Sequence, residues 1–170
     1  MKTVLFIGTH NVFRSKYAEA YFNYMCRKNR KPGGGTLSDE YIATSKGTYI
    51  GQGRLPRFKA LWHENVSTAC HTPHANKLRY SDVVGADIII GMYEPEIRPQ
   101  LFYETSVAVT KRVRGTWSPA DTTSAEYWRV PNLVGTGDCS DGCEIDDPYE
   151  IASLIEFNVE LLLDNITDYC

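Results

Sequence analysis

The sequence predicts an α/β fold, in which a four-stranded parallel sheet is flanked by helices on both faces. Short apolar runs of strand length alternate with segments whose apolar residues recur at helical spacing. The run from Ile88 to Met92 is apolar without interruption, which is typical of a strand buried on both faces of a parallel sheet. Connections between parallel strands are right-handed, so a chain of 170 residues has few topologies open to it. We expect one domain over residues 1–170.

The first half of the chain is expected to form two strands and two helices. Residues 3–7 are an apolar strand, and residues 16–26 follow a short polar loop as an amphipathic helix. A basic connector with three consecutive glycines, residues 29–35, predicts an exposed loop before a short strand at 41–43. Residues 55–63 have helical spacing after a glycine-rich entry and predict a short helix.

The second half is expected to complete the sheet and cover it. The segment 82–92 ends in the buried strand described above. Residues 94–102 predict a helix that tolerates a proline in its first turn and is kinked or shortened by a second proline. Residues 106–110 are the expected fourth strand, and the apolar spacing of residues 150–166 predicts the final helix.

Composition excludes several classes of function. With 42% hydrophobic and 23% charged residues the chain is typical of a globular protein, and no apolar run is long enough to cross a membrane. A net charge of -3 gives no general attraction for nucleic acid, and the basic residues after the first helix are explained by a solvated helix end. The strand that follows Lys2 is too short for a secretory h-region, so we expect a cytoplasmic protein.

The cysteines indicate reduced thiols. They are odd in number and widely scattered, at Cys26, Cys70, Cys139, Cys143 and Cys170. A zinc site could be assembled from these cysteines and the histidines near Cys70, but no standard ligand spacing is met. We therefore expect no metal and no cofactor.

A polar loop between the first strand and the first helix carries the clearest chemistry. It consists of Gly8, Thr9, His10, Asn11, Val12, Phe13, Arg14 and Ser15. Backbone N–H groups of such a loop and the positive end of the helix dipole converge on one point, over which the Arg14 guanidinium can close. We expect all eight residues to bind phosphate, sulfate or a similar oxyanion.

Two other interpretations of the loop fit the sequence less well. A nucleotide-binding kinase loop would carry glycine where Phe13 stands, and Asp87 precedes its apolar strand instead of ending it. A merely well-capped turn leaves Arg14 unexplained, because the helix dipole disfavours a cation at a helix start.

The same loop, with Ala18-Glu19-Ala20 downstream, resembles the C-x5-R-S signature of the low-molecular-weight protein tyrosine phosphatases and their arsenate-reductase relatives. The resemblance implies a three-layer sandwich and hydrolysis through a cysteinyl-phosphate. Gly8 stands where that family has its nucleophilic cysteine, and Thr9, the nearest hydroxyl, has no obvious base beside it. We expect a protein that binds phosphate or a phosphotyrosine partner with little turnover. The alternative is an active tyrosine phosphatase whose cysteine was replaced in this sequence.

The family resemblance also implies a carboxylic acid shortly before the last helix, which protonates the leaving phenolate. Asp147, in Asp-Pro-Tyr, matches that element literally, although it also suits the start of a helix. Asn132, in Val-Pro-Asn, matches a version with Asn for Asp, and we slightly favour it. Tyr149 in the first case, or Tyr127 and Trp128 in the second, would form an aromatic wall for the substrate.

Two further elements resemble family segments that support the loop. Ser45, at the end of the second strand, either supports the loop or satisfies its own turn. His71 and His74 are rivals for the histidine that fixes the loop asparagine, here Asn11. The long polar segment 111–146 would overhang the loop and select the ligand.

Overall fold

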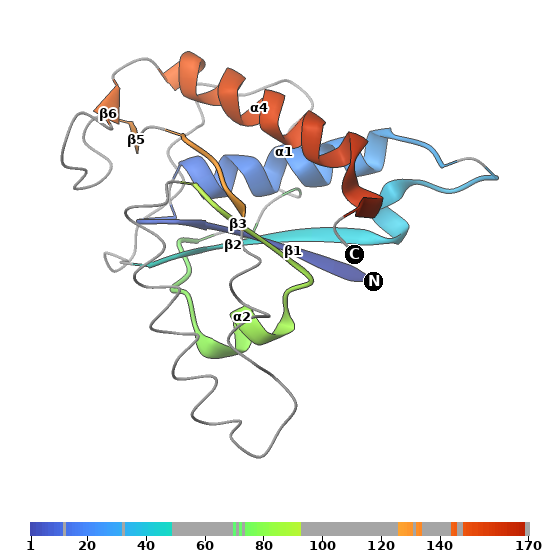
Figure 1. Ribbon diagram of the computed structural model, residues 1–170, viewed down its shortest axis with the longest axis horizontal. Coiled ribbons are helices and arrows are strands. Elements are labelled where there is room, and N and C mark those ends of the chain that lie inside the picture. The colour runs from blue at the N-terminus through green and yellow to red at the C-terminus, as the bar shows by residue number, and fades with distance from the viewer. Residues whose placement is uncertain are drawn as a thin grey trace.

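The computed structural model describes residues 1–11, 13–31, 33–48, 70, 72, 74–92, 126–130, 132–133, 144–145 and 148–168 (Figure 1). The elements in chain order are β1 (Lys2–Gly8), α1 (Arg14–Lys28), η1 (Leu37–Asp39), β2 (Tyr41–Gly47), α2 (Tyr80–Gly85), β3 (Ile88–Gly91), β4 (Glu126–Tyr127), β5 (Asn132–Leu133), β6 (Glu144–Ile145), α4 (Pro148–Asp164) and η5 (Ile166–Asp168).

The main sheet has four parallel strands in the order β2-β1-β3-β4, and β5 and β6 form a separate parallel pair. Helices α1 and α4 lie on one face of the sheet and α2 lies on the other (Figure 1). The predicted α/β class, with four parallel strands between helical layers, is confirmed. No described helix is long and apolar enough to cross a membrane.

Strand β1 divides its side chains between two cores. Val4 and Phe6 belong to the cluster under α1 and α4, whereas Leu5 and Ile7 join the cluster on the α2 side. This alternation is the period of two that a strand imposes on its side chains. Strand β1 lies between β2 and β3, so side chains on both of its faces are buried. The loop that follows β1 therefore leaves from an inner strand at the sheet's carboxyl edge.

Aromatic residues join α1 to α4. The rings of Phe13, Tyr17 and Tyr21 stack along α1 with 6.3 Å between successive centroids. The Tyr17 hydroxyl donates to Glu156 Oε1 at 2.5 Å, and the Tyr21 hydroxyl donates to Glu160 Oε1 at 2.8 Å. Burial, together with these bonds to carboxylates, raises the pKa of both tyrosines.

Several expected boundaries move. The helix expected at 16–26 begins at Arg14, and the strand expected at 41–43 extends to Gly47. The final helix, expected at 150–166, begins and ends two residues earlier. Within the segment 82–92, the first residues form the end of α2, which the sequence had not predicted as a helix.

The strand next to β3 is β4, inside the segment that was expected to be a loop. Two residues are too few to show an alternating pattern, so this strand has no signal in the sequence. The strand expected at 106–110 and the helices expected at 55–63 and 94–102 lie outside the described residues.

Candidate anion-binding site

The loop between β1 and α1 surrounds a small cavity of about 10 Å³, lined by Gly8, Thr9, His10, Asn11, Phe13, Arg14 and Ser15. Seven of the eight predicted binding residues therefore meet at one point, and the eighth, Val12, lies outside the described residues. A cavity of this size holds about one water molecule.

Arg14 lines this cavity with only 3% of its surface exposed. Its Nη1 donates to the Val130 carbonyl at 3.0 Å, and its Nη2 donates to Thr9 Oγ1 at 3.3 Å. The longer of these bonds joins two residues that both line the cavity. The guanidinium is thus hydrogen-bonded within the fold and is not turned outward to solvent.

Asn11 fixes the shape of the loop. It adopts a left-handed backbone conformation (φ 56°), which asparagine tolerates better than most residues. Its side-chain Nδ2 donates to Ser15 Oγ at 2.9 Å, and its Oδ1 accepts the backbone N–H of Asn76 at 2.8 Å. We expected a histidine side chain to fix Asn11, and the structure places the Asn76 backbone N–H against its Oδ1. His74 is exposed, and its carbonyl oxygen accepts a hydrogen bond from Lys16 Nζ. His71 lies outside the described residues.

Two glycines allow the loop to lie close to its neighbours. A Cβ atom at Gly8 would lie 2.8 Å from Ser15 Oγ, and one at Gly47 would lie 2.7 Å from the Thr9 carbonyl oxygen. Both separations are shorter than a carbon and an oxygen tolerate, so either side chain forces a rearrangement. The hydroxyl of Ser15 thus lies against the space that a side chain at position 8 would use.

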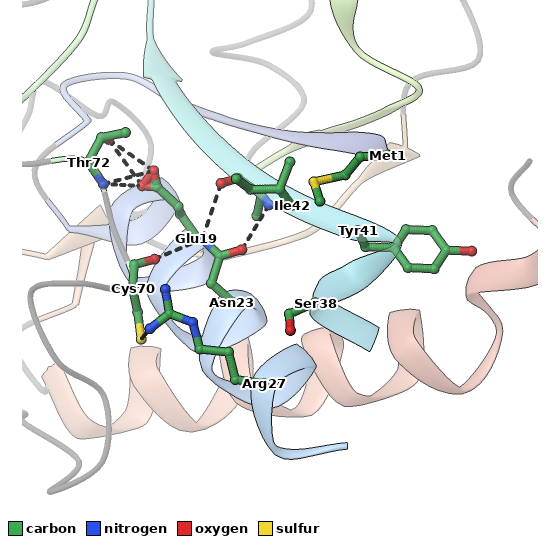
Figure 2. Close-up of a pocket in the computed structure, with 10 residues that line it drawn as sticks. Met1, Glu19, Asn23, Arg27, Ser38, Tyr41, Ile42, Cys70 and Thr72 are labelled. Carbon is green, nitrogen blue, oxygen red and sulfur yellow. Dashed lines mark hydrogen bonds between the residues drawn. The ribbon is translucent and has the colours of Figure 1, made fainter. Parts of the chain in front are cut away.

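Ser45 supports the site indirectly. It is fully buried, and its Oγ donates to the carboxylate of Glu19 on α1 at 3.3 Å. Glu19 also accepts the backbone N–H and the Oγ of Thr72, both at 2.9 Å (Figure 2). Ser45 is thus part of a buried network behind the loop. Its contact is with α1, and the loop itself is contacted from β2 by Gly47.

The predicted aromatic wall of Tyr127 and Trp128 is wrong. Trp128 is 5% exposed, and its ring lies 5.6 Å from that of Phe6 in the core under α1. Tyr127 packs against the cluster on the opposite face of the sheet. Consecutive residues of an extended chain point to opposite faces, so these two rings cannot form one wall.

Only one of the two candidate acids lies among the described residues. Asn132 is the first residue of β5, whereas Asp147 immediately precedes α4 and lies outside the described residues. Pro148 is the first residue of α4, where proline is favoured, and Tyr149 beside it is 62% exposed. The choice between Asn132 and Asp147 stays a prediction.

A second cavity, of about 380 Å³, lies beside α1 and β2 (Figure 2). It is larger than the loop cavity but contains none of residues 8–15. Asn23, which lines it, donates to the carbonyls of Ala43 and Cys70 and accepts the Ala43 N–H, so this amide is satisfied by the protein. We assign the candidate site to the loop, where the helix end and a buried guanidinium meet.

The thiols and charged groups elsewhere are not arranged as a metal site in the described part of the chain. No group of three or more His, Cys, Asp or Glu residues is placed to hold a metal ion there. Cys26 and Cys70 are buried free thiols, and burial raises the pKa of Cys26 to about 12. The other three cysteines lie outside the described residues.

Comparison with known proteins identifies the fold. No protein-family model matches the chain, and no curated protein sequence matches it. Solved structures do. A low-molecular-weight protein tyrosine phosphatase from T. tengcongensis is 18% identical with a TM-score of 0.59, and 97% of this chain and 99% of that one are covered. The chain has the fold of the low-molecular-weight protein tyrosine phosphatases.

Two further solved structures support the assignment of this phosphatase fold. A low-molecular-weight phosphotyrosine phosphatase from Vibrio cholerae O395 is 18% identical with a TM-score of 0.62, and 98% of this chain and 97% of that one are covered. A thioredoxin-dependent arsenate reductase from Corynebacterium glutamicum is 17% identical with a TM-score of 0.60, and 98% of this chain and 62% of that one are covered. Identities this low establish the fold alone. The kinase-like interpretation is not supported, because the position where it requires glycine is occupied by Phe13, whose side chain packs in the core.

Proposed function

We propose that this chain binds phosphate, or a partner that carries phosphotyrosine, in the loop of residues 8–15 and does not hydrolyse it. The observation that carries the proposal is the combination of Gly8 and Arg14. The buried Arg14 guanidinium and the N-terminal end of α1 face a cavity at the carboxyl edge of the sheet. At the position where the family resemblance places a nucleophile, the chain has no side chain.

The absence of a thiolate favours binding over turnover. A thiolate at position 8 would place a negative charge against the anion, and its removal lowers the electrostatic cost of holding phosphate there. Thr9 is a poor substitute nucleophile, because its Oγ1 accepts a hydrogen bond from the Arg14 guanidinium, which cannot take up a proton. The charge that binds the ligand is retained, and the group that would attack it is missing.

The partner class follows from the likeness to phosphatases that act on phosphotyrosine. If Asn132 occupies the position of the general acid, the chain also lacks the group that protonates a phenolate, which agrees with a binding role. If Asp147 occupies it, only the nucleophile is missing. We further propose that the protein works in the cytoplasm as a single domain over residues 1–170, in keeping with the buried free thiols.

Calorimetric titration with phosphate, arsenate and a phosphotyrosine peptide tests the binding. Arg14→Ala removes the charge-assisted hydrogen bonds to the ligand, so we expect Kd to rise about 10- to 100-fold. Arg30→Ala is the matched control, since Arg30 is exposed beyond the far end of α1. Absence of phosphate binding by the unaltered chain, or equal loss of affinity in both variants, contradicts the proposal.

A steady-state assay with an aryl phosphate tests the lack of turnover. The unaltered chain should release no phosphate above background, and multiple turnover at phosphatase rates refutes the proposal. Gly8→Cys separates the two candidate acids. Full turnover of substrates with poor leaving groups in that variant assigns the acid to Asp147, whereas turnover limited to good leaving groups assigns the position to Asn132.

A further inference from the structure

Lys16 is a fully buried lysine in the first turn of α1. A lysine is almost never buried completely unless its ammonium is paired or hydrogen-bonded. Here Nζ donates to Thr72 Oγ1 at 2.6 Å and to the His74 carbonyl at 2.9 Å. The side chain therefore connects the start of α1 to a stretch of chain 56 to 58 residues away in the sequence.

The same stretch also holds the loop. The Asn76 backbone N–H donates to Asn11 Oδ1 at 2.8 Å, and the Asn76 side chain donates to the His74 carbonyl at 2.7 Å. Beyond it, the Gly47 N–H donates to the Asn76 carbonyl, and the Leu78 N–H donates to the Gly47 carbonyl, both at 2.8 Å. Residues 74–78 are thus fixed to the end of β2 on one side and to the loop and α1 on the other.

Charged groups around Lys16 come from two elements. Glu19, one turn along α1, is fully buried and accepts two hydrogen bonds from Thr72 (Figure 2). The Oγ of Thr72 in turn accepts a hydrogen bond from Lys16. Lys46 on β2 pairs with Asp82 at 3.5 Å. Burial lowers the pKa of Lys16 to about 8; the Glu19 carboxylate acts in the opposite direction, and Lys46 lowers the pKa further.

We propose that Lys16 is a positioning residue, which holds Thr72 and residues 74–76 against α1 so that the Asn76 N–H is presented to Asn11 and the loop keeps its shape. Lys16 lies behind the loop, among Thr72 and His74, and is not one of the residues that line the loop cavity. Its effect on a ligand passes through Asn76 and Asn11. The proposal rests on the proposed function only for its ligand measurement, because the state of the Asn76 N–H can be measured without ligand.

The test compares Lys16→Met, which keeps the length of the side chain and removes the ammonium, with Lys77→Met. Lys77 is exposed in the same stretch and serves as the matched control. Amide hydrogen exchange should be about 10-fold faster at Asn76 in Lys16→Met, beyond any change at Ile89 and Ile90 of the central strand β3. Phosphate Kd should rise about 3- to 10-fold, the effect of losing about one net hydrogen bond.

A merely structural lysine gives a different result. If Lys16→Met only lowers global stability, Asn76 and the amides of β3 accelerate together, and that outcome overturns the proposal. An unchanged Asn76 amide overturns it as well. If the unaltered chain binds no phosphate, the proposed function fails, but the exchange measurement still decides the role of Lys16.

A second pair of variants covers the case in which Lys16→Met does not fold. Thr72→Val removes the hydroxyl that accepts from Lys16, together with its bonds to Glu19 and the Asn76 side chain, whereas Thr72→Ser retains it. We expect faster exchange at Asn76 in the valine variant and near-normal exchange in the serine variant. Equal exchange in the two variants refutes the positioning role.

Discussion

Gly8→Ala is the substitution whose cost can be worked out most directly from the structure. The backbone at Gly8 is an ordinary strand, so alanine is not excluded by conformation and should gain about 0.4–1 kcal/mol from the less flexible unfolded chain. The added Cβ, however, would lie 2.8 Å from Ser15 Oγ. Overpacking of this kind costs about 1–3 kcal/mol.

Relief of that contact has its own cost. If the Ser15 hydroxyl rotates away, it loses the hydrogen bond from Asn11 Nδ2, which contributes about 0.5–1.5 kcal/mol. We expect a net loss of about 2 kcal/mol in the free energy of unfolding, or a fall in Tm of about 4–8 °C for a chain of this size. Gly85→Ala is the matched control, because a Cβ at Gly85 meets nothing within 4 Å. That variant should be neutral or slightly stabilised.

Thermal unfolding followed by circular dichroism measures both variants, and a double-mutant cycle with Ser15→Ala identifies the cause. In the Ser15→Ala background the hydroxyl is absent, so Gly8→Ala should cost less than about 1 kcal/mol. A Gly8→Ala variant as stable as the unaltered chain refutes the reasoning. Strict additivity with Ser15→Ala refutes it equally, since the two positions would then not be in contact.

The remaining predictions concern Gly47 and the buried side chains of Tyr17 and Lys16. Gly47→Ala should lower the free energy of unfolding by about 3 kcal/mol, more than Gly8→Ala. The reason is that its Cβ would lie 2.7 Å from the Thr9 carbonyl oxygen, a backbone atom that cannot rotate away. Chemical denaturation measures both variants, and a loss of unfolding free energy no larger than that of Gly8→Ala contradicts the prediction. Stability should fall as pH rises above about 10, where an unfolded tyrosine loses its proton while Tyr17, whose pKa is raised by burial and by Glu156, keeps it. Lys16 has the opposite sign, since its lowered pKa lets the folded state release a proton first, and its contribution to stability rises between pH 8 and 10.5. In a plot of Tm against pH above 10.5, the Tm of Tyr17→Phe should therefore decline less steeply than that of the unaltered chain. Parallel curves would show that Tyr17 does not cause the decline.

The spacing of apolar residues was sufficient to predict those helices and strands that are long enough to show a clear periodicity. The apolar run of β1 and the helical spacing of α1 and α4 placed these elements within two residues or so of their observed ends. Strand β4 has only two residues, and its place beside β3 depends on the tertiary fold. The loop between β1 and α1 was predictable for the same local reason, since its residues are contiguous.

The support of the loop was not predictable, because it joins residues far apart in the sequence. Asn76 reaches Asn11 across 65 residues through its backbone, and any residue except proline has the same N–H to offer. Lys16 did leave a signal, since a lysine in the first turn of a helix opposes the helix dipole. That signal indicates an unusual environment, but the partners of the ammonium become evident only from the structure.

The central claim is that the loop holds a phosphomonoester without cleaving it. A phosphorus NMR spectrum of a phosphotyrosine peptide mixed with an equal amount of the protein reports on both parts at once. We predict a shifted or broadened phosphomonoester signal that persists for hours, with no inorganic phosphate appearing. Growth of an inorganic phosphate signal at phosphatase rates, or a phosphomonoester signal identical to that of the free peptide, would contradict the account.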